Sequence, residues 1–142
     1  MNILVDTNVI LDVLLDRAPF VENSTLIMGK VERRAVSGML CATTLTTIHY
    51  LACKNIGKDE GTVAIKRLLQ IYQIAAVDYQ VLLLALNSGF KDYEGSVLHS
   101  AAIKAGADAI ITRNIKDFAL SELPVFTPEE FMVRMSDESL DS

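Results

Sequence analysis

The chain contains 142 residues with a formal net charge of −5; 51% of its residues are hydrophobic and 22% are charged. This size and composition fit one folded domain with a core buried on two sides, and they exclude a disordered chain. The negative charge argues against a broadly basic surface for nucleic acid, but acids that hold a divalent cation still admit a phosphodiester. No apolar run approaches the ~20 residues of a membrane span and no basic leader opens the chain, so we expect a cytoplasmic protein without membrane attachment.

Short apolar runs alternate with amphipathic segments along the chain. Ile3–Val5 is typical of a buried strand, and the helix-start residues Asp6, Thr7 and Asn8 follow it directly. In the first half the pattern predicts, in order, a helix over Thr7–Leu15, a helix from Pro19 to about Arg34, a strand over Gly38–Ala42, a helix from Thr43 to about Asn55, and a helix that begins at Asp59 and Glu60.

The second half of the chain continues this alternation. It predicts, in order, a strand over Ile74–Val77, a helix from Asp78 to about Asn87, a polar loop over Ser88–Gly95, a helix that ends at Ala105, a strand over Ala107–Thr112, a turn over Asn114–Phe118, a strand over Pro124–Phe126, and a last helix opened by Thr127 and Pro128.

Strands that alternate with helices predict a parallel sheet covered by helices on both faces. We therefore expect an α/β fold, a three-layer α/β/α sandwich with a twisted parallel sheet of four to five strands. The domain is expected to span residues 1–135. Residues 136–142 contain three acids and no base, and are expected to form a disordered acidic tail.

Acidic residues follow strands or open helices in three separate segments. Asp6 follows the first strand, Asp92 and Glu94 open the helix that ends at Ala105, and Asp117 follows the fourth strand. Ligands bind at the carboxyl ends of parallel strands, so these acids converge if the first and fourth strands are neighbours. Crowded carboxylates raise one another's pKa unless a cation lies between them. Their oxygens suit Mg²⁺ or Mn²⁺, which would orient a water and stabilise charge on a phosphodiester.

Two motifs carry a family resemblance. Val5–Asp12 reads VDTNVILD and Ala107–Phe118 reads ADAIITRNIKDF. Together they resemble the PIN-domain family, and the similarity covers nearly the whole chain in the right order. The resemblance implies a twisted parallel sheet with helices on both sides and metal-dependent ribonuclease activity on an RNA substrate. Many small members of the family resemble VapC-type toxins, which implies an antitoxin partner.

The resemblance also implies site residues. The first and last acids of the family fall on Asp6 and Asp117, and Asn8, Thr112 and Asn114 match the polar residues that support them. Two acidic positions depart from the pattern. The acid on the helix after the second strand falls at about Thr47, and the third acid falls at about Gly95, beside Asp92 and Glu94. The predicted catalytic and metal-binding set is therefore Asp6, Asp92, Glu94 and Asp117, with Asn8, Thr47, Thr112 and Asn114 in support and Arg113 at the substrate.

Each of these residues also has a structural interpretation. Asp6 and Asp92 suit helix N-caps, Glu94 suits the first turn of a helix, and Asp117 suits a turn. Arg113 is as well explained by an ordinary surface charge. Asp12 and Asp16 are interpreted as solvated charges on the face of the first helix.

The cysteines and histidines carry little functional signal. Cys41 and Cys53 lie in apolar surroundings without a CxxC pair, so we expect buried free thiols. His49 lies one helical turn before Cys53, but two ligands without a third make a weak zinc signal. We interpret His49 and His99 as packed or surface histidines.

Three functions remain in competition. The first is a Mg²⁺- or Mn²⁺-dependent RNA endonuclease, and the second is a catalytically weakened PIN fold that binds RNA or protein. An α/β phosphatase with an aspartate nucleophile is disfavoured, because Asn8 stands where that chemistry needs a second Asp. The apolar segment Val21–Val31 would suit a homodimer face or an antitoxin, although burial in the monomer explains it equally well.

Overall fold

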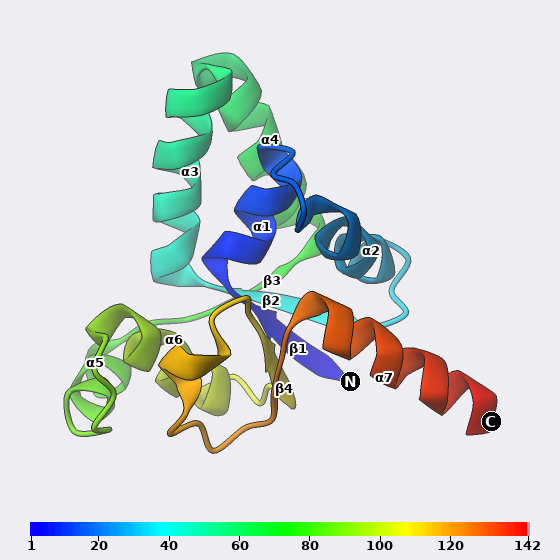
Figure 1. The fold of residues 1–142 in the computed structure, drawn as a ribbon. Helices are drawn as coiled ribbons and strands as arrows, with labels where there is room; N and C mark the ends of the chain where they lie inside the picture. The colour runs from blue at the N-terminus through cyan, green and yellow to red at the C-terminus, as the bar shows by residue number, and fades with distance from the viewer. Residues whose placement is uncertain (142) are drawn as a thin grey trace.

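Five parallel strands form the centre of the computed structural model, which describes the backbone of residues 1–141 and the side chains of residues 1–136 (Figure 1). The strands are β1 (Asn2–Val5), β2 (Ser37–Cys41), β3 (Gln73–Ala75), β4 (Ala109–Ile111) and β5 (Val125–Phe126). The helices are α1 (Thr7–Leu14), α2 (Val21–Glu32), α3 (Ala42–Ile56), α4 (Lys58–Ile71), α5 (Tyr79–Leu86), α6 (Tyr93–Lys104), the short 3-10 helix η1 (Ile115–Phe118) and α7 (Pro128–Asp141).

The strand order is β3-β2-β1-β4-β5, and every neighbouring pair is parallel. β1 lies between β2 and β4, with Leu4 opposite both Met39 and Ile110. The chain adds strands on one side of β1 and then on the other. The crevice at the carboxyl ends of β1 and β4 is therefore a topological switch point, where α/β sheets bind ligands.

The sheet separates two apolar cores, because successive residues of a strand face opposite sides. Ile3 and Val5 of β1 pack in the core under α1, α2, α3, α4 and α7, whereas Leu4 packs under α5 and α6. Figure 1 shows α5 and α6 on one side of the sheet, opposite α1 to α4. The predicted three-layer α/β/α fold with a parallel sheet is confirmed, and the sheet has five strands.

Several predicted boundaries differ from the structure. α2 begins at Val21 instead of Pro19, which belongs to the turn before it, and it ends before Arg34, whose φ of 60° is left-handed. β3 lies at Gln73–Ala75, earlier than the predicted Ile74–Val77, because the backbone pairs with Met39–Cys41 of β2. The pairing with β2, which local sequence does not report, sets the position of β3.

The last helix begins as its sequence predicts. The Thr127 hydroxyl accepts a hydrogen bond from the Glu130 N–H at 3.1 Å, and the Glu130 carboxylate accepts one from the Thr127 N–H at 3.2 Å. This reciprocal capping box fixes the start of α7. The backbone of the predicted acidic tail belongs to α7 through Asp141, and Ser142 lies outside the described residues. Within the described part of the chain, no helix is both long enough and apolar enough to cross a bilayer.

α3 and α4 form a hairpin that projects from the sheet (Figure 1). Gly61 of α4 is buried against Cys53 of α3, so a Cβ at this position would lie 2.6 Å from the Cys53 Sγ and 2.9 Å from its backbone N and Cα. The absence of a side chain therefore allows the two helices to approach this closely.

We expect Gly61→Ala to lower the free energy of unfolding by about 1–3 kcal/mol, because overpacking against a fixed backbone outweighs the gain in helix propensity. Gly29→Ala in α2 is the matched control. Its Cβ would meet only the end of the Arg33 side chain, at 3.0 Å, so up to about 1 kcal/mol of stabilisation is expected. Urea unfolding of both variants measures the difference, and equal effects would contradict the assigned packing.

Candidate functional site

A cavity of about 340 Å³ lies at the carboxyl ends of β1 and β4. Its wall contains eight of the nine residues that the sequence singled out for the site: Asp6, Asn8, Thr47, Asp92, Glu94, Arg113, Asn114 and Asp117. The ninth, Thr112, is buried directly behind Asp6. The fold thus brings together segments that are distant in the sequence.

Asp6 is partly buried, and both of its carboxylate oxygens accept hydrogen bonds. Oδ1 accepts from the Thr7 N–H at 2.7 Å, which caps α1, and Oδ2 accepts from the Thr112 hydroxyl at 2.8 Å. The Asn8 side-chain amide reaches Oδ2 at 3.5 Å. The predicted role of Asp6 as a helix cap is therefore confirmed, and the same carboxylate faces the cavity.

Burial raises the pKa of Asp6, and the hydrogen bonds from Thr112 and Thr7 oppose this rise. The negative charges of Asp117 and Asp92 raise the Asp6 pKa further. Asp117 and Asp92 therefore each repel the Asp6 carboxylate.

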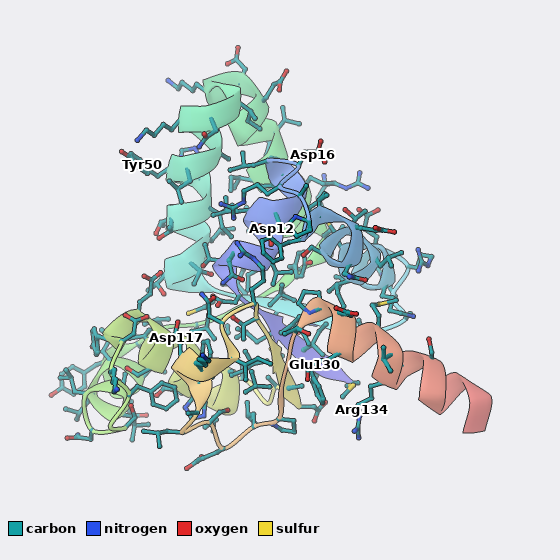
Figure 2. All side chains as sticks on the ribbon, viewed as in Figure 1. Asp12, Asp16, Tyr50, Asp117, Glu130 and Arg134 are labelled. Carbon is teal, nitrogen blue, oxygen red and sulfur yellow. The ribbon has the colours of Figure 1, made fainter. Side chains whose placement is uncertain are left out.

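Thr112 connects Asp6 to the segment that carries Asp117. Its hydroxyl donates to Asp6 and accepts from the Asn114 N–H at 3.0 Å. The Asn114 carbonyl then accepts from the Asp117 N–H at 3.0 Å, which shapes the turn into η1. Figure 2 shows Asp117 on η1, where its side chain is exposed at the cavity wall.

Asp92 is the N-cap of α6, since its Oδ2 accepts from the Gly95 N–H at 3.2 Å. Asp92 and Glu94 are both exposed, and both line the cavity. A Cβ placed on Gly95 would lie 3.4 Å from Asp92 Oδ2. The Asp92 carboxylate thus lies next to the position that a side chain at Gly95 would occupy. Thr47 faces the same cavity from α3 without a charge.

The interpretation of Asp12 from the sequence as a solvated charge is wrong, because Asp12 is completely buried. Its Oδ1 accepts from Arg17 Nε at 2.9 Å and from an Arg113 terminal nitrogen at 3.2 Å, and its Oδ2 forms an ion pair with Arg113 Nε at 2.7 Å. Figure 2 labels Asp12 on α1. Of the two aspartates predicted to be exposed, only Asp16 is exposed. Two arginines replace the water that a buried carboxylate loses.

Sequence reasoning missed Arg17 and misjudged Asp12. The available signal was a single acid within the apolar run Val9–Leu15 of a helix that is buried on most sides. A charge there needs a partner.

Arg113 is held from two sides. Its guanidinium lies 3.9 Å from the centre of the Phe20 ring, and its backbone N–H donates to Asn8 Oδ1 at 3.4 Å. Arg113 lines the cavity, and its charge is shared with Asp12; its predicted contact with the substrate stays a prediction.

The histidines and cysteines lie outside this site. His99 is buried, stacks on Phe90, and accepts the Glu122 N–H at 3.0 Å, and burial lowers its pKa. His49 and Cys53 lie 3.4 Å apart on α3. Both cysteines are free, as expected, although Cys53 is only partly buried. Among the described residues, no group of three or more His, Cys, Asp or Glu side chains is arranged to hold a metal ion.

The sequence model of the PIN domain matches residues 2–116. The chain belongs to the PIN domain family. This membership confirms the resemblance carried by the two motifs around Asp6 and Asp117. No curated protein sequence matches the chain significantly.

Solved structures with the same PIN fold come from several bacteria. VapBC2 of Rickettsia felis, bound to promoter DNA, matches with a TM-score of 0.69 at 14% identity, covering 88% of this chain and 97% of that one. A toxin–antitoxin complex of Klebsiella pneumoniae gives 0.66 at 21% identity, covering 88% and 96%. The Mycobacterium tuberculosis VapC20 toxin, which cleaves the sarcin-ricin loop, gives 0.63 at 11% identity, covering 76% and 86%. At these identities the similarity concerns the fold.

The raised pKa of Asp6 makes the stability of this PIN domain depend on pH. Between the ordinary value of 3.8 and its raised value, the folded state binds more protons than the unfolded chain. The contribution of Asp6 to stability therefore decreases as pH rises through this window. We expect Asp6→Asn to raise the melting temperature at neutral pH without divalent ions, and the gain to shrink as pH falls toward 3.8.

Differential scanning calorimetry over this pH range measures the effect. Asp59→Asn, which removes the same charge from an exposed site at the start of α4, is the control and should show no such gain. A lower melting temperature for Asp6→Asn at neutral pH would contradict the assigned burial.

Removing the buried carboxylate should destabilise the PIN domain strongly. We expect Asp12→Ala to lower the free energy of unfolding by about 3 kcal/mol. This is the lower end of the range for breaking a buried ion pair, because both arginines reach solvent and can be hydrated there. Glu32→Ala breaks the exposed pair with Arg67 (3.1 Å) and should cost at most about 1 kcal/mol. Chemical denaturation compares the two, and similar losses would refute the special role of Asp12.

Proposed function

We propose that this PIN domain is a divalent-metal-dependent RNA endonuclease. The observation that carries the proposal is the convergence of Asp6, Asp92 and Asp117 from three segments on one cavity at the switch point of the sheet. The Coulomb effect of Asp92 and Asp117 on Asp6 supports it, because mutually repelling carboxylates attract a cation.

The donor chemistry fits Mg²⁺ or Mn²⁺, which prefer carboxylate and other oxygen ligands. Asp6, Asp92 and Asp117 would hold the ion, with Glu94 as a further donor. Asp92, Glu94 and Asp117 are exposed, so rotation of their side chains toward Asp6 meets little packing resistance. When bound, the ion would supply a charge that activates water and stabilises the phosphodiester during in-line attack.

The supporting residues hold Asp6 in one orientation. The Thr112 hydroxyl and the Thr7 N–H fix its two oxygens, and the Asn8 amide lies against Oδ2. Asn114 shapes the turn that presents Asp117. Thr47 lines the same cavity from α3 without a charge. Since Asp92 lies next to Gly95, we infer that Asp92 replaces the family's third acid.

We further propose that the domain acts as the toxin of a toxin–antitoxin pair in the cytoplasm. Structures of such pairs from Rickettsia felis and Klebsiella pneumoniae share its fold and support this role. The expected partners are RNA, an antitoxin protein and a second copy of the chain. Phe20, at the start of α2, and Leu26, in the middle of the helix, expose 41% and 47% of their surface and are available for a protein partner.

The second candidate is a PIN domain that binds RNA or protein without cleavage. Two features favour it: Thr47 carries no charge where the family has an acid, and no three acids of the described residues are placed to share an ion. Metal binding separates the two functions.

We expect Asp6→Asn to lower the rate of RNA cleavage in Mn²⁺ by at least about 100-fold, because several kcal/mol of charge stabilisation depend on the ion. Mn²⁺ should also raise the melting temperature of the wild type, and this shift should be lost in Asp6→Asn. Asp59→Asn should keep both properties. Cleavage that survives Asp6→Asn would exclude the proposed mechanism, whereas no cleavage and no Mn²⁺ shift in the wild type would favour the binding module.

A further inference from the structure

Two arginines line the same cavity as the four acids. Arg17 follows the last turn of α1 and Arg113 follows β4, so they arrive from different segments. Their side chains expose 39% and 24% of their surface. Both are anchored on the completely buried Asp12. The cavity therefore has a positively charged edge beside its acidic wall.

We propose that Arg17 and Arg113 together bind a phosphate of single-stranded RNA next to the phosphodiester at the acids. The inference rests on the proposed nuclease function and assigns the residues that receive the substrate. It also gives a role to Asp12, which is a positioning residue because it acts through the two arginines.

Both arginines keep terminal N–H groups that can donate hydrogen bonds to a ligand. One terminal nitrogen of Arg113 donates to Asp12 Oδ1, and its Nε forms the ion pair with Asp12 Oδ2. Arg17 donates from Nε to Asp12 Oδ1 and from one terminal nitrogen to the Asn8 carbonyl at 3.4 Å. Within the part of the chain that the structure describes, the other terminal nitrogen of each arginine has no protein acceptor. A guanidinium fork with free N–H groups matches phosphate oxygens.

The charge balance also favours an anion. One carboxylate and two guanidiniums leave a net charge of about +1 at this edge, since arginine is always protonated. The acids that line the same cavity repel an RNA backbone before a cation binds. A positive edge beside them gives the backbone a point of attachment and sets its register in the cavity.

The arginines are held in place before any ligand arrives. Asp12 is buried, and the ring of Phe20 lies against the Arg113 guanidinium at 3.9 Å. A side chain that is already ordered loses less conformational entropy on binding. Buried ion pairs often add little to net stability. The buried Asp12 is explained instead by the two guanidinium groups that it holds at the substrate.

The test is the salt dependence of RNA binding. A short fluorescein-labelled single-stranded RNA is titrated with wild type, Arg17→Gln and Arg113→Gln in EDTA at several KCl concentrations. Each substitution leaves Asp12 with one arginine and so cancels the positive edge. We expect the affinity to fall about tenfold or more, and the slope of log K against log salt to flatten by about 0.7, the value for one phosphate contact.

Arg67→Gln is the matched control, because Arg67 is exposed on α4 and pairs with Glu32 away from the cavity. It should keep the wild-type slope. Arg17→Gln is the decisive variant, since Asp12 keeps Arg113 and the fold is retained; a melting curve checks this. An unchanged slope in Arg17→Gln would overturn the proposal. The arginines would then bind a carboxylate of a protein partner or no ligand at all.

Cleavage separates this proposal from the nuclease function. If Asp6→Asn abolishes cleavage while Arg17→Gln keeps the wild-type slope, the nuclease survives and the phosphate site is wrong. If Asp6→Asn cleaves like the wild type while Arg17→Gln flattens the slope, the phosphate site survives and the mechanism is wrong.

Discussion

The pairing of β1 with β4 is the contact on which the candidate site depends. Val5 lies opposite Ile111, and the Asp6 N–H donates to the Ile111 carbonyl at 2.9 Å. Directly beyond this pair, the Thr112 hydroxyl reaches Asp6 across 106 positions of sequence. Because both strands end at the same level, the two motifs that lie farthest apart in the chain meet at one edge of the sheet.

Opposite charges are arranged around this edge in two different ways. The acids Asp6, Asp92 and Asp117 line one cavity, and burial together with the charges of Asp117 and Asp92 raises the pKa of Asp6. Asp12 instead lies in the interior and is neutralised by Arg17 and Arg113. Burial requires this pairing, since an isolated buried carboxylate is too costly to keep its charge. Asp12 thereby fixes the positions of the Arg17 and Arg113 guanidinium groups beside the cavity.

The two departures from the family's acid pattern have different structural consequences. At Gly95 the missing side chain lies next to Asp92, whose carboxylate also caps α6, so a neighbouring acid is present in the same part of the cavity. At Thr47 the residue that lines the cavity from α3 has no carboxylate. The charge in this part of the site therefore depends on Asp92 and Glu94 at the start of α6.

The sequence by itself determined the α/β class, the two-sided burial of Ile3–Val5 and the segments that carry the candidate acids, because periodicity and helix-start residues are local signals. The tertiary structure alone decided which strand lies beside β1, where β3 begins, and that Asp12 is buried between Arg17 and Arg113. These depend on contacts between distant segments. The apolar run around Asp12 indicates that its charge needs a partner, but only the fold decides that the partners are Arg17 and Arg113.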